Sequence, residues 1–245
     1  LEKTKDISEL KDWLGNQEAI LSWKLDGLTI VLKYNEGKLV QAVTRGNGSI
    51  GEEITPNAKA FSNIPLSIGF KGELILRGEA VIKYSEFEKI NERLPEDEQY
   101  KNPRNLCSGT VRQLNTAITK ERNVCFYAFT LVRAEGVDFE NSRENQFKWL
   151  ETQGFDVVEN VIVNADSLES TVESFEKKIQ HFDIPSDGLV LLMSDIAYGE
   201  SLGATSKFPR NAMAFKWTDE TRETKLKYIE WSPSRTGLIN PVAVF

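Results

Sequence analysis

Lys24 and Asp26 are the first two side chains of this sequence whose types and spacing point to chemistry. They lie in residues 22–28, which read S-W-K-L-D-G-L within a run of alternating apolar and polar residues. Side chains two residues apart on a strand share one face, so we expect the amine and the carboxylate to be neighbours. A lysine that desolvation and nearby cations keep partly neutral is a nucleophile. The alternative is a surface hairpin with a salt-bridged lysine.

Further segments with charged residues and glycines follow along the chain. They are residues 44–48 (T-R-G-N-G), 77–79 (R-G-E), 102–105 (N-P-R-N), 186–190 (S-D-G-L-V) and 214–217 (A-F-K-W). A single K-x-D-G sequence is common by chance, but the order and spacing of the whole set are specific. Together these segments resemble the adenylation domain of bacterial NAD-dependent DNA ligases, and the resemblance covers nearly the whole chain.

The resemblance implies a reaction and three catalytic residues. Lys24 would attack the α-phosphate of NAD, release nicotinamide mononucleotide and carry AMP, which then passes to the 5′-phosphate of nicked DNA for phosphodiester formation. Asp26 would orient Lys24 or bind the ribose or metal, and Lys216 would neutralise the α-phosphate. Such a transfer needs positive charge at the phosphate and a divalent metal. The implied cofactors are NAD as AMP donor and Mg²⁺, with no zinc in this part of the protein.

The same resemblance assigns a nucleotide site to residues from distant parts of the chain. The predicted set is Ser22, Leu25, Arg45, Glu79, Phe129, Asp187 and Val190. Phe129 and Val190 would hold adenine between an aromatic ring and an aliphatic side chain; without the resemblance both would be interpreted as core residues. Glu79 would contact the ribose hydroxyls and is the candidate Mg²⁺ ligand. Its alternative role is a weak ion pair with Arg77 at a strand edge.

Four basic residues are predicted to contact DNA: Arg104, Arg112, Lys207 and Arg210. The first two lie in residues 102–114, N-P-R-N-L-C-S-G-T-V-R-Q-L, which resemble a long signature of the family. Guanidinium groups match phosphate oxygens, and phosphate contacts position DNA without reading its sequence. The net charge of −7 does not exclude this partner, because the basic residues gather in the motif segments. The predicted partner is therefore nicked double-stranded DNA.

Two positions depart from the family pattern. Ser22 stands where the family has a glutamate that helps to recognise adenine, and Leu192 stands where a phosphate-binding lysine is expected. Loss of that charge-assisted contact removes about 1.5–3 kcal/mol. We therefore expect a divergent ligase. Two alternatives stay open: a pseudoenzyme that binds nucleotide or DNA without catalysis, and an ATP- or GTP-dependent RNA ligase or capping-type nucleotidyltransferase.

The composition is that of an ordinary globular protein, with 40% hydrophobic and 27% charged residues in 245. No apolar run approaches the roughly 18 residues that a membrane span needs, and the first residues do not form a signal peptide. The resemblance implies a cytoplasmic protein that acts in DNA replication and repair, and we expect it to be a monomer. Cys107 and Cys125 are expected to be reduced thiols rather than a disulfide. The single His181 argues against a histidine-based metal site. Because the chain does not begin with Met, we expect it to be part of a longer protein.

Alternating and helical patterns predict the elements that position these residues. The predicted strands are 20–34, 38–45, 73–82, 124–133, 157–163, 188–193, 212–217 and 225–231. The predicted helices are 7–14, 85–94, 142–153 and 167–182. Residues 35–37 predict a hairpin turn. Hairpins mixed with separate helices favour an α+β fold with mainly antiparallel sheets, and the resemblance implies the nucleotidyltransferase catalytic-domain fold of DNA ligases and mRNA capping enzymes.

Two regions are expected along the chain. Residues 1–220 would form the adenylation domain, and residues 221–245 a linker and the truncated beginning of an OB-fold, with the boundary in the polar stretch 218–224. The resemblance also implies that a nicotinamide-recognising segment precedes Leu1, and that zinc-binding and helix-hairpin-helix parts follow Phe245.

Overall fold

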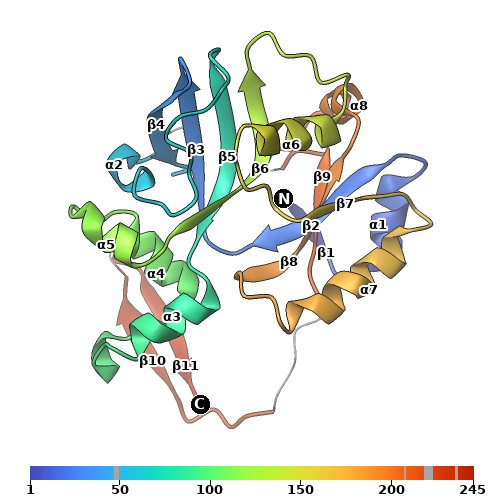
Figure 1. Cartoon of the computed structure of the whole chain (residues 1–245). Coiled ribbons are helices and arrows are strands. Elements are labelled where there is room, and N and C mark those ends of the chain that lie inside the picture. The colour runs from blue at the N-terminus through green and yellow to red at the C-terminus, as the bar shows by residue number, and fades with distance from the viewer. Residues whose placement is uncertain (47–49, 207, 218–222, 235–236) are drawn as a thin grey trace.

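The structure is a computed structural model, and it describes residues 1–46, 50–206, 208–217, 223–234 and 237–245. In these residues a five-stranded sheet has the order β1-β9-β8-β2-β7, and a four-stranded sheet has the order β4-β3-β5-β6 (Figure 1). A separate two-stranded hairpin is formed by β10 and β11. The strands pair antiparallel except for β1 and β9, which are parallel. The predicted α+β fold with mainly antiparallel sheets is confirmed.

The elements of both sheets and their helices have the following bounds. The strands are β1 Glu2–Thr4, β2 Ala19–Leu25, β3 Leu28–Asn35, β4 Lys38–Thr44, β5 Leu74–Val81, β6 Cys125–Ala134, β7 Asn160–Val163, β8 Ser186–Met193, β9 Ala212–Phe215, β10 Tyr228–Pro233 and β11 Ile239–Val244. The helices are α1 Ile7–Leu14, α2 Thr55–Ala58, α3 Tyr84–Asn91, α4 Pro103–Thr110, α5 Thr116–Glu121, α6 Arg143–Thr152, α7 Leu168–Ile179 and α8 Ile196–Ser201, with a 3₁₀ turn η1 Glu96–Glu98.

The chain passes from one sheet to the other at Asp26 and Gly27, so the predicted single strand over residues 20–34 is wrong. β2 pairs with β7 and β8, whereas β3 pairs with β4 and β5. Gly27 lies so close to β5 that a Cβ atom would come within 2.0 Å of the Ala80 carbonyl oxygen. Only glycine fits there. Because β2 ends at Leu25, Asp26 lies beyond the strand, and the expected alternation that placed it beside Lys24 does not apply.

Each sheet has its own core. Apolar residues of α1 and α7 pack on the five-stranded sheet around Trp23. Residues of α2, α4 and α6 pack on the four-stranded sheet around Tyr34 and Phe126. Both cysteines are buried and free, as expected. The site described below therefore lies between two separately packed halves, at the point where the chain passes from one to the other.

Several local signals gave the correct elements. Asp6 caps α1 by accepting from the Ser8 amide, and the helix ends at Gly15. Glu36 and Gly37 both have positive φ, as the two-residue turn between β3 and β4 requires. The helix predicted over residues 85–94 begins one residue earlier, at Tyr84, and ends earlier, at Asn91. Its N-cap is Lys83, and the Ser85 hydroxyl donates to Asp183. In the described part of the chain, no helix is long and apolar enough to cross a membrane.

The last described residues form the β10–β11 hairpin, whose side chains are almost all exposed. Its presence agrees with the predicted strand near residues 225–231, although β10 begins later and ends later than predicted. Residues 218–222 of the expected boundary lie outside the described residues. The assignment of residues 221–245 to the start of an OB-fold stays a prediction.

Candidate active site

Lys24, Asp187 and Lys216 form one cluster at the ends of three neighbouring strands. Lys24 lies near the end of β2, Asp187 near the start of β8, and Lys216 directly after β9. Because β8 lies between β2 and β9, its carboxylate reaches both amines. Lys24 Nζ donates to Asp187 Oδ1 at 2.5 Å, and Lys216 Nζ donates to Oδ2 at 2.7 Å. The three side chains are between 23% and 30% exposed, so the cluster is partly withdrawn from water.

The charge of Asp187 is fixed by these two amines. Burial by itself would raise the pKa of its carboxyl, but the hydrogen bonds from Lys216 and Lys24 outweigh burial and hold the pKa below its ordinary value. Gly188, with a φ of 149°, allows β8 to lie this close to β9. A Cβ atom at Gly188 would lie 2.2 Å from the Phe215 carbonyl oxygen. The sequence predicted all three residues but not their pairing.

The residues just before Asp187 hold the backbone around Lys24. The Asp26 amide donates to the Pro185 carbonyl oxygen at 2.8 Å. The Ser186 hydroxyl donates to the Lys24 carbonyl oxygen at 2.9 Å. Neither Pro185 nor Ser186 was predicted as a site residue, because their contacts join positions more than 150 residues apart.

Glu79 lies on β5 directly opposite Thr29 of β3 and is only 9% exposed. Its carboxylate accepts from the Gly27 amide at 3.1 Å and from the Thr29 hydroxyl at 2.8 Å. These contacts replace the ion pair with Arg77 that we considered as an alternative. Burial raises the pKa of Glu79 to about 7, although the hydrogen bonds from Thr29 and Gly27 act in the opposite direction. The positive charges of Arg104 and Lys24 also act on this carboxylate, so Glu79 lies near the lysine cluster.

Asp26 pairs with Arg104 rather than with Lys24. The Arg104 guanidinium donates to Asp26 Oδ1 at 2.7 Å. Arg104 belongs to the first turn of α4, a helix capped by Asn102 and started by Pro103. Asn at the N-cap followed by Pro at N1 is a typical signal for the start of a helix, although α4 was not among the predicted helices. The ion pair joins α4 to the link between the two sheets.

The predicted adenine-contacting residues come from both sheets. Ser22 and Val190 are register partners on β2 and β8, and Leu192 lies two residues further along β8, on the same face as Val190. Leu25 ends β2 and packs on the core of the five-stranded sheet. Phe129 is the extra residue of a β-bulge in β6, between the partners Ala128 and Thr130. A bulge redirects a side chain, and Phe129 packs against the other sheet's core. Its contact with adenine stays a prediction.

A match to the NAD-dependent DNA ligase adenylation domain covers residues 3–220. The chain belongs to this family. It is 63% identical to a DNA ligase of Lachnoclostridium phytofermentans and 61% identical to one of Ruminiclostridium cellulolyticum. Each comparison covers 100% of this chain but only 38% and 37% of those ligases, so the chain spans well under half of their length. A solved archaeal ATP-dependent RNA ligase shares the fold, with a TM-score of 0.51 and 14% identity over 89% of this chain and 47% of that chain.

Of the three predicted DNA-contacting residues that the structure describes, the adenylation domain brings two together. Arg104 lies in α4, and Arg112 follows the same helix and pairs with Glu52. Arg210 lies before β9, where its carbonyl oxygen accepts from Trp13 of α1. Figure 1 shows α1 and α4 on opposite sides of the molecule. Lys207 lies outside the described residues. Arg45 is exposed, and its amide donates to the Thr29 carbonyl oxygen, which places its backbone beside β3.

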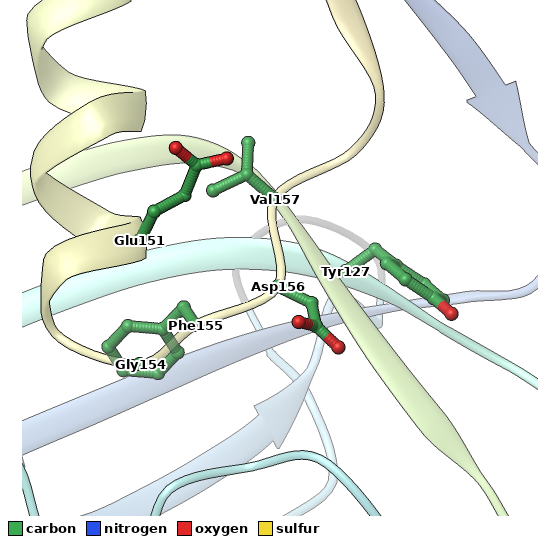
Figure 2. Close-up of a pocket in the computed structure, with 6 residues that line it drawn as sticks. All are labelled: Tyr127, Glu151, Gly154, Phe155, Asp156 and Val157. Atoms are coloured by element: carbon green, nitrogen blue, oxygen red, sulfur yellow. The ribbon is translucent and has the colours of Figure 1, made fainter.

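A cavity beside β6 is separate from the lysine cluster. Figure 2 shows it between β6 and the segment after α6. Its volume is about 550 Å³. Its lining residues are Tyr127, Glu151, Gly154, Phe155, Asp156 and Val157. The ionisable groups among them are acidic or phenolic, which is unsuited to phosphate. No predicted site residue among those that the structure describes lines this cavity.

Proposed function

We propose that this domain forms a covalent lysyl-AMP on Lys24, with NAD as the AMP donor, and that the protein seals nicks in double-stranded DNA. The observation that supports this most strongly is the pair of amines on one carboxylate. Lys24 and Lys216 approach the two oxygens of Asp187 from neighbouring strands. Because both amines reach one carboxylate, an α-phosphate in its place would lie within reach of Lys24 for attack and of Lys216 for charge compensation.

In the proposed reaction, Lys24 gives up a proton to solvent water, and its neutral nitrogen forms a bond to the α-phosphorus of NAD. The bond from that phosphorus to the bridging oxygen breaks, and nicotinamide mononucleotide leaves with this oxygen. Lys216 remains protonated and offsets the negative charge on the phosphate oxygens. Asp187 holds both amines in place before NAD binds. Asp26 acts through its pair with Arg104, which fixes the link beside the nucleophile.

The residues near Lys24 fit a magnesium ion that is shared with substrate. Over the described ranges, no group of three or more His, Cys, Asp and Glu residues is arranged to hold a metal. Mg²⁺ commonly takes one or two carboxylates and completes its shell with water and phosphate oxygens. Glu79 supplies such a carboxylate, with a free lone pair on each oxygen beyond its two hydrogen bonds. When bound, Mg²⁺ would offset charge on the phosphate.

Transfer of AMP to the DNA and closure of the nick would depend on exposed arginines that contact the DNA. Arg104 and Arg112 are 59% and 40% exposed, and their ion pairs with acidic partners are of the weak surface kind. A DNA phosphate can replace such a partner. We further propose that the protein acts as a monomer in replication and repair. Its location would be the cytoplasm, where NAD and nicked chromosomal DNA are both found.

A nick-sealing assay tests the proposal. The full-length protein is incubated with a labelled nicked duplex and Mg²⁺, with NAD in one series and ATP in another. Sealing that requires NAD and ignores ATP is expected. Sealing with ATP alone would move the protein to the RNA ligase and capping-enzyme class.

The pseudoenzyme alternative depends on a single position of the sequence. Leu192 lies between Ile20 and Ala212 in the sheet, on the face that carries Val190, so an apolar side chain occupies the position of an expected cation. Binding of nicked DNA or AMP without any sealed product or nicotinamide mononucleotide release would support this alternative against ours.

A further inference from the structure

Residues 182–187, which comprise the end of the α7–β8 connection and the first two residues of β8, support the segment that carries Lys24. Phe182 stacks on Trp23, the residue before the nucleophile, with ring centroids 4.3 Å apart and an interplanar angle of 18°. Pro185, Ser186 and Asp187 add the contacts to residues 24–26 described above. One continuous stretch of six residues therefore contacts the segment that carries the nucleophile at four points.

Asp183, the second residue of this stretch, is hydrogen-bonded to the start of α3. Its carbonyl oxygen accepts from the Tyr84 amide at 2.8 Å. Its carboxylate accepts from the Ser85 amide at 2.8 Å and from the Ser85 hydroxyl at 2.7 Å. The helix's own N-cap residue, Lys83, makes no side-chain cap. Asp183 therefore caps α3 from a distant part of the sequence, which satisfies free amides and places a negative charge at the helix N-terminus.

This cap joins the two halves of the molecule next to the site. α3 begins three residues after β5, the strand that carries Glu79, and belongs with the four-stranded sheet. Residues 182–187 lead into β8 of the five-stranded sheet, and Figure 1 shows the start of α3 beside this connection. The bonds of Asp183 thus link the stretch that holds Lys24 to the element that directly follows the strand of Glu79.

We propose that Asp183 is a positioning residue for the adenylation reaction: its bonds to α3 fix the lysine cluster relative to Glu79. The inference rests on the proposed function, because it concerns the rate of lysyl-AMP formation. Attack on phosphorus depends steeply on the relative position of the reacting groups, and a displacement of about 1 Å can slow a reaction by about 10²-fold. Asp183 contacts neither nucleophile nor substrate, so it acts through residues 185–187.

The test compares Asp183→Ala with Asp183→Asn in the full-length protein by single-turnover adenylation with NAD. Asparagine keeps the cap, since its Oδ1 accepts from the Ser85 amide and its Nδ2 donates to the Ser85 hydroxyl. We expect Asp183→Ala to lower the rate constant by roughly 10- to 100-fold with a much smaller change in NAD affinity, and Asp183→Asn to stay within about threefold of wild type. Ser85→Ala, which removes one of the three bonds, serves if Asp183→Ala does not fold and should slow the reaction by about threefold.

The matched control is Asp195→Ala. Asp195 caps α8 by accepting from the Tyr198 amide at 2.7 Å, so this variant loses an equivalent cap away from the lysine cluster. It should lose thermal stability and keep the adenylation rate, measured well below its melting temperature. Equal rates in wild type and folded Asp183→Ala would overturn the inference. So would equal losses in Asp183→Ala and Asp195→Ala, or in Asp183→Ala and Asp183→Asn.

Hydrogen exchange separates failure of this inference from failure of the proposed function. Asp183→Ala should speed exchange of the Asp26 amide, which donates to Pro185, and leave the Ile54 amide, which donates to Ala42, unchanged. If the wild-type protein forms no adduct, the proposed function fails and exchange at Asp26 decides whether Asp183 positions the segment. An unchanged exchange rate at Asp26 would overturn the positioning role whatever the enzyme does.

Discussion

Replacing Glu79 by glutamine removes an ionisable group from a buried position while keeping its shape. The glutamine Oε1 can accept from the Gly27 amide, and the Thr29 hydroxyl can accept from its Nε2. The variant therefore resembles the protonated wild type. Any difference between the two proteins that grows with pH reports the cost of charging Glu79 in its buried position.

The magnitude follows from the raised pKa of Glu79, about 7 against an ordinary value of 4.5. In the window between these values the folded protein holds a proton that the unfolded chain releases, so the free energy of unfolding of the wild type falls as pH rises through it. A difference of about 2.5 pH units, at about 1.36 kcal/mol each, sets an upper limit of about 3 kcal/mol. Above pH 7 the difference is constant, because both states are then ionised.

Urea unfolding, followed by tryptophan fluorescence from about pH 4.5 to 8, measures this difference. Other carboxylates contribute equally to both proteins, so subtraction isolates Glu79. Glu79→Gln should gain stability relative to wild type as pH rises, by up to about 3 kcal/mol, whereas Glu88→Gln on the exposed side of α3 should follow the wild-type profile. A constant difference between Glu79→Gln and wild type across this range would refute the reasoning.

Three further predictions concern the site and its surroundings. Leu192→Lys should speed adenylation by up to roughly 10²-fold by restoring a cation at the phosphate. Val161→Lys, which adds the same charge on edge strand β7, should leave the rate unchanged. Equal rates in Leu192→Lys and wild type would mean that residue 192 does not contact the phosphate. Gly27→Ala should lower the free energy of unfolding by about 1–3 kcal/mol or more, because its Cβ would lie 2.0 Å from the Ala80 oxygen, whereas Gly69→Ala, with nothing closer than 3.8 Å, should be nearly neutral in a urea titration. Arg112→Ala should weaken binding of nicked DNA uniformly across sequences and reduce the salt dependence of the binding constant by about one phosphate contact. Fluorescence anisotropy at several salt concentrations measures both effects. An unchanged salt dependence would mean that Arg112 does not contact DNA.

The sequence predicted most elements because their signals are local. Caps such as Asp6 and Ser142 and the Glu36-Gly37 turn act within a few residues, and the structure has them where the pattern indicates. The break at Asp26 was missed although the alternation changes phase there: the apolar residues are 21, 23 and 25 before it and 28, 30 and 32 after it. What ends β2 there is the close packing of Gly27 on β5, which depends on a residue more than 50 positions away.

The same distinction between local and long-range signals applies to the site. Local motifs identified Lys24, Asp187, Lys216 and Glu79, whereas the order of the strands determines which partners these residues contact. Asp187 bonds both lysines because β8 lies between β2 and β9, and no local pattern gives that order. The bulge at Phe129 and the cap that Asp183 provides for α3 also depend on long-range pairing. Such contacts need the folded structure.

The most direct test of the account is the mass of the protein after incubation with NAD and Mg²⁺. Intact-mass spectrometry of the full-length wild type should show one added adenylate, lost on addition of nicked DNA. Lys33→Ala, which removes a partly exposed lysine paired with Glu73 on the neighbouring sheet, should form the adduct normally. Lys24→Ala should remain folded and show no adduct. Adduct formation in Lys24→Ala at the wild-type rate, or its absence from the wild type, would contradict the assignment of Lys24 as the nucleophile.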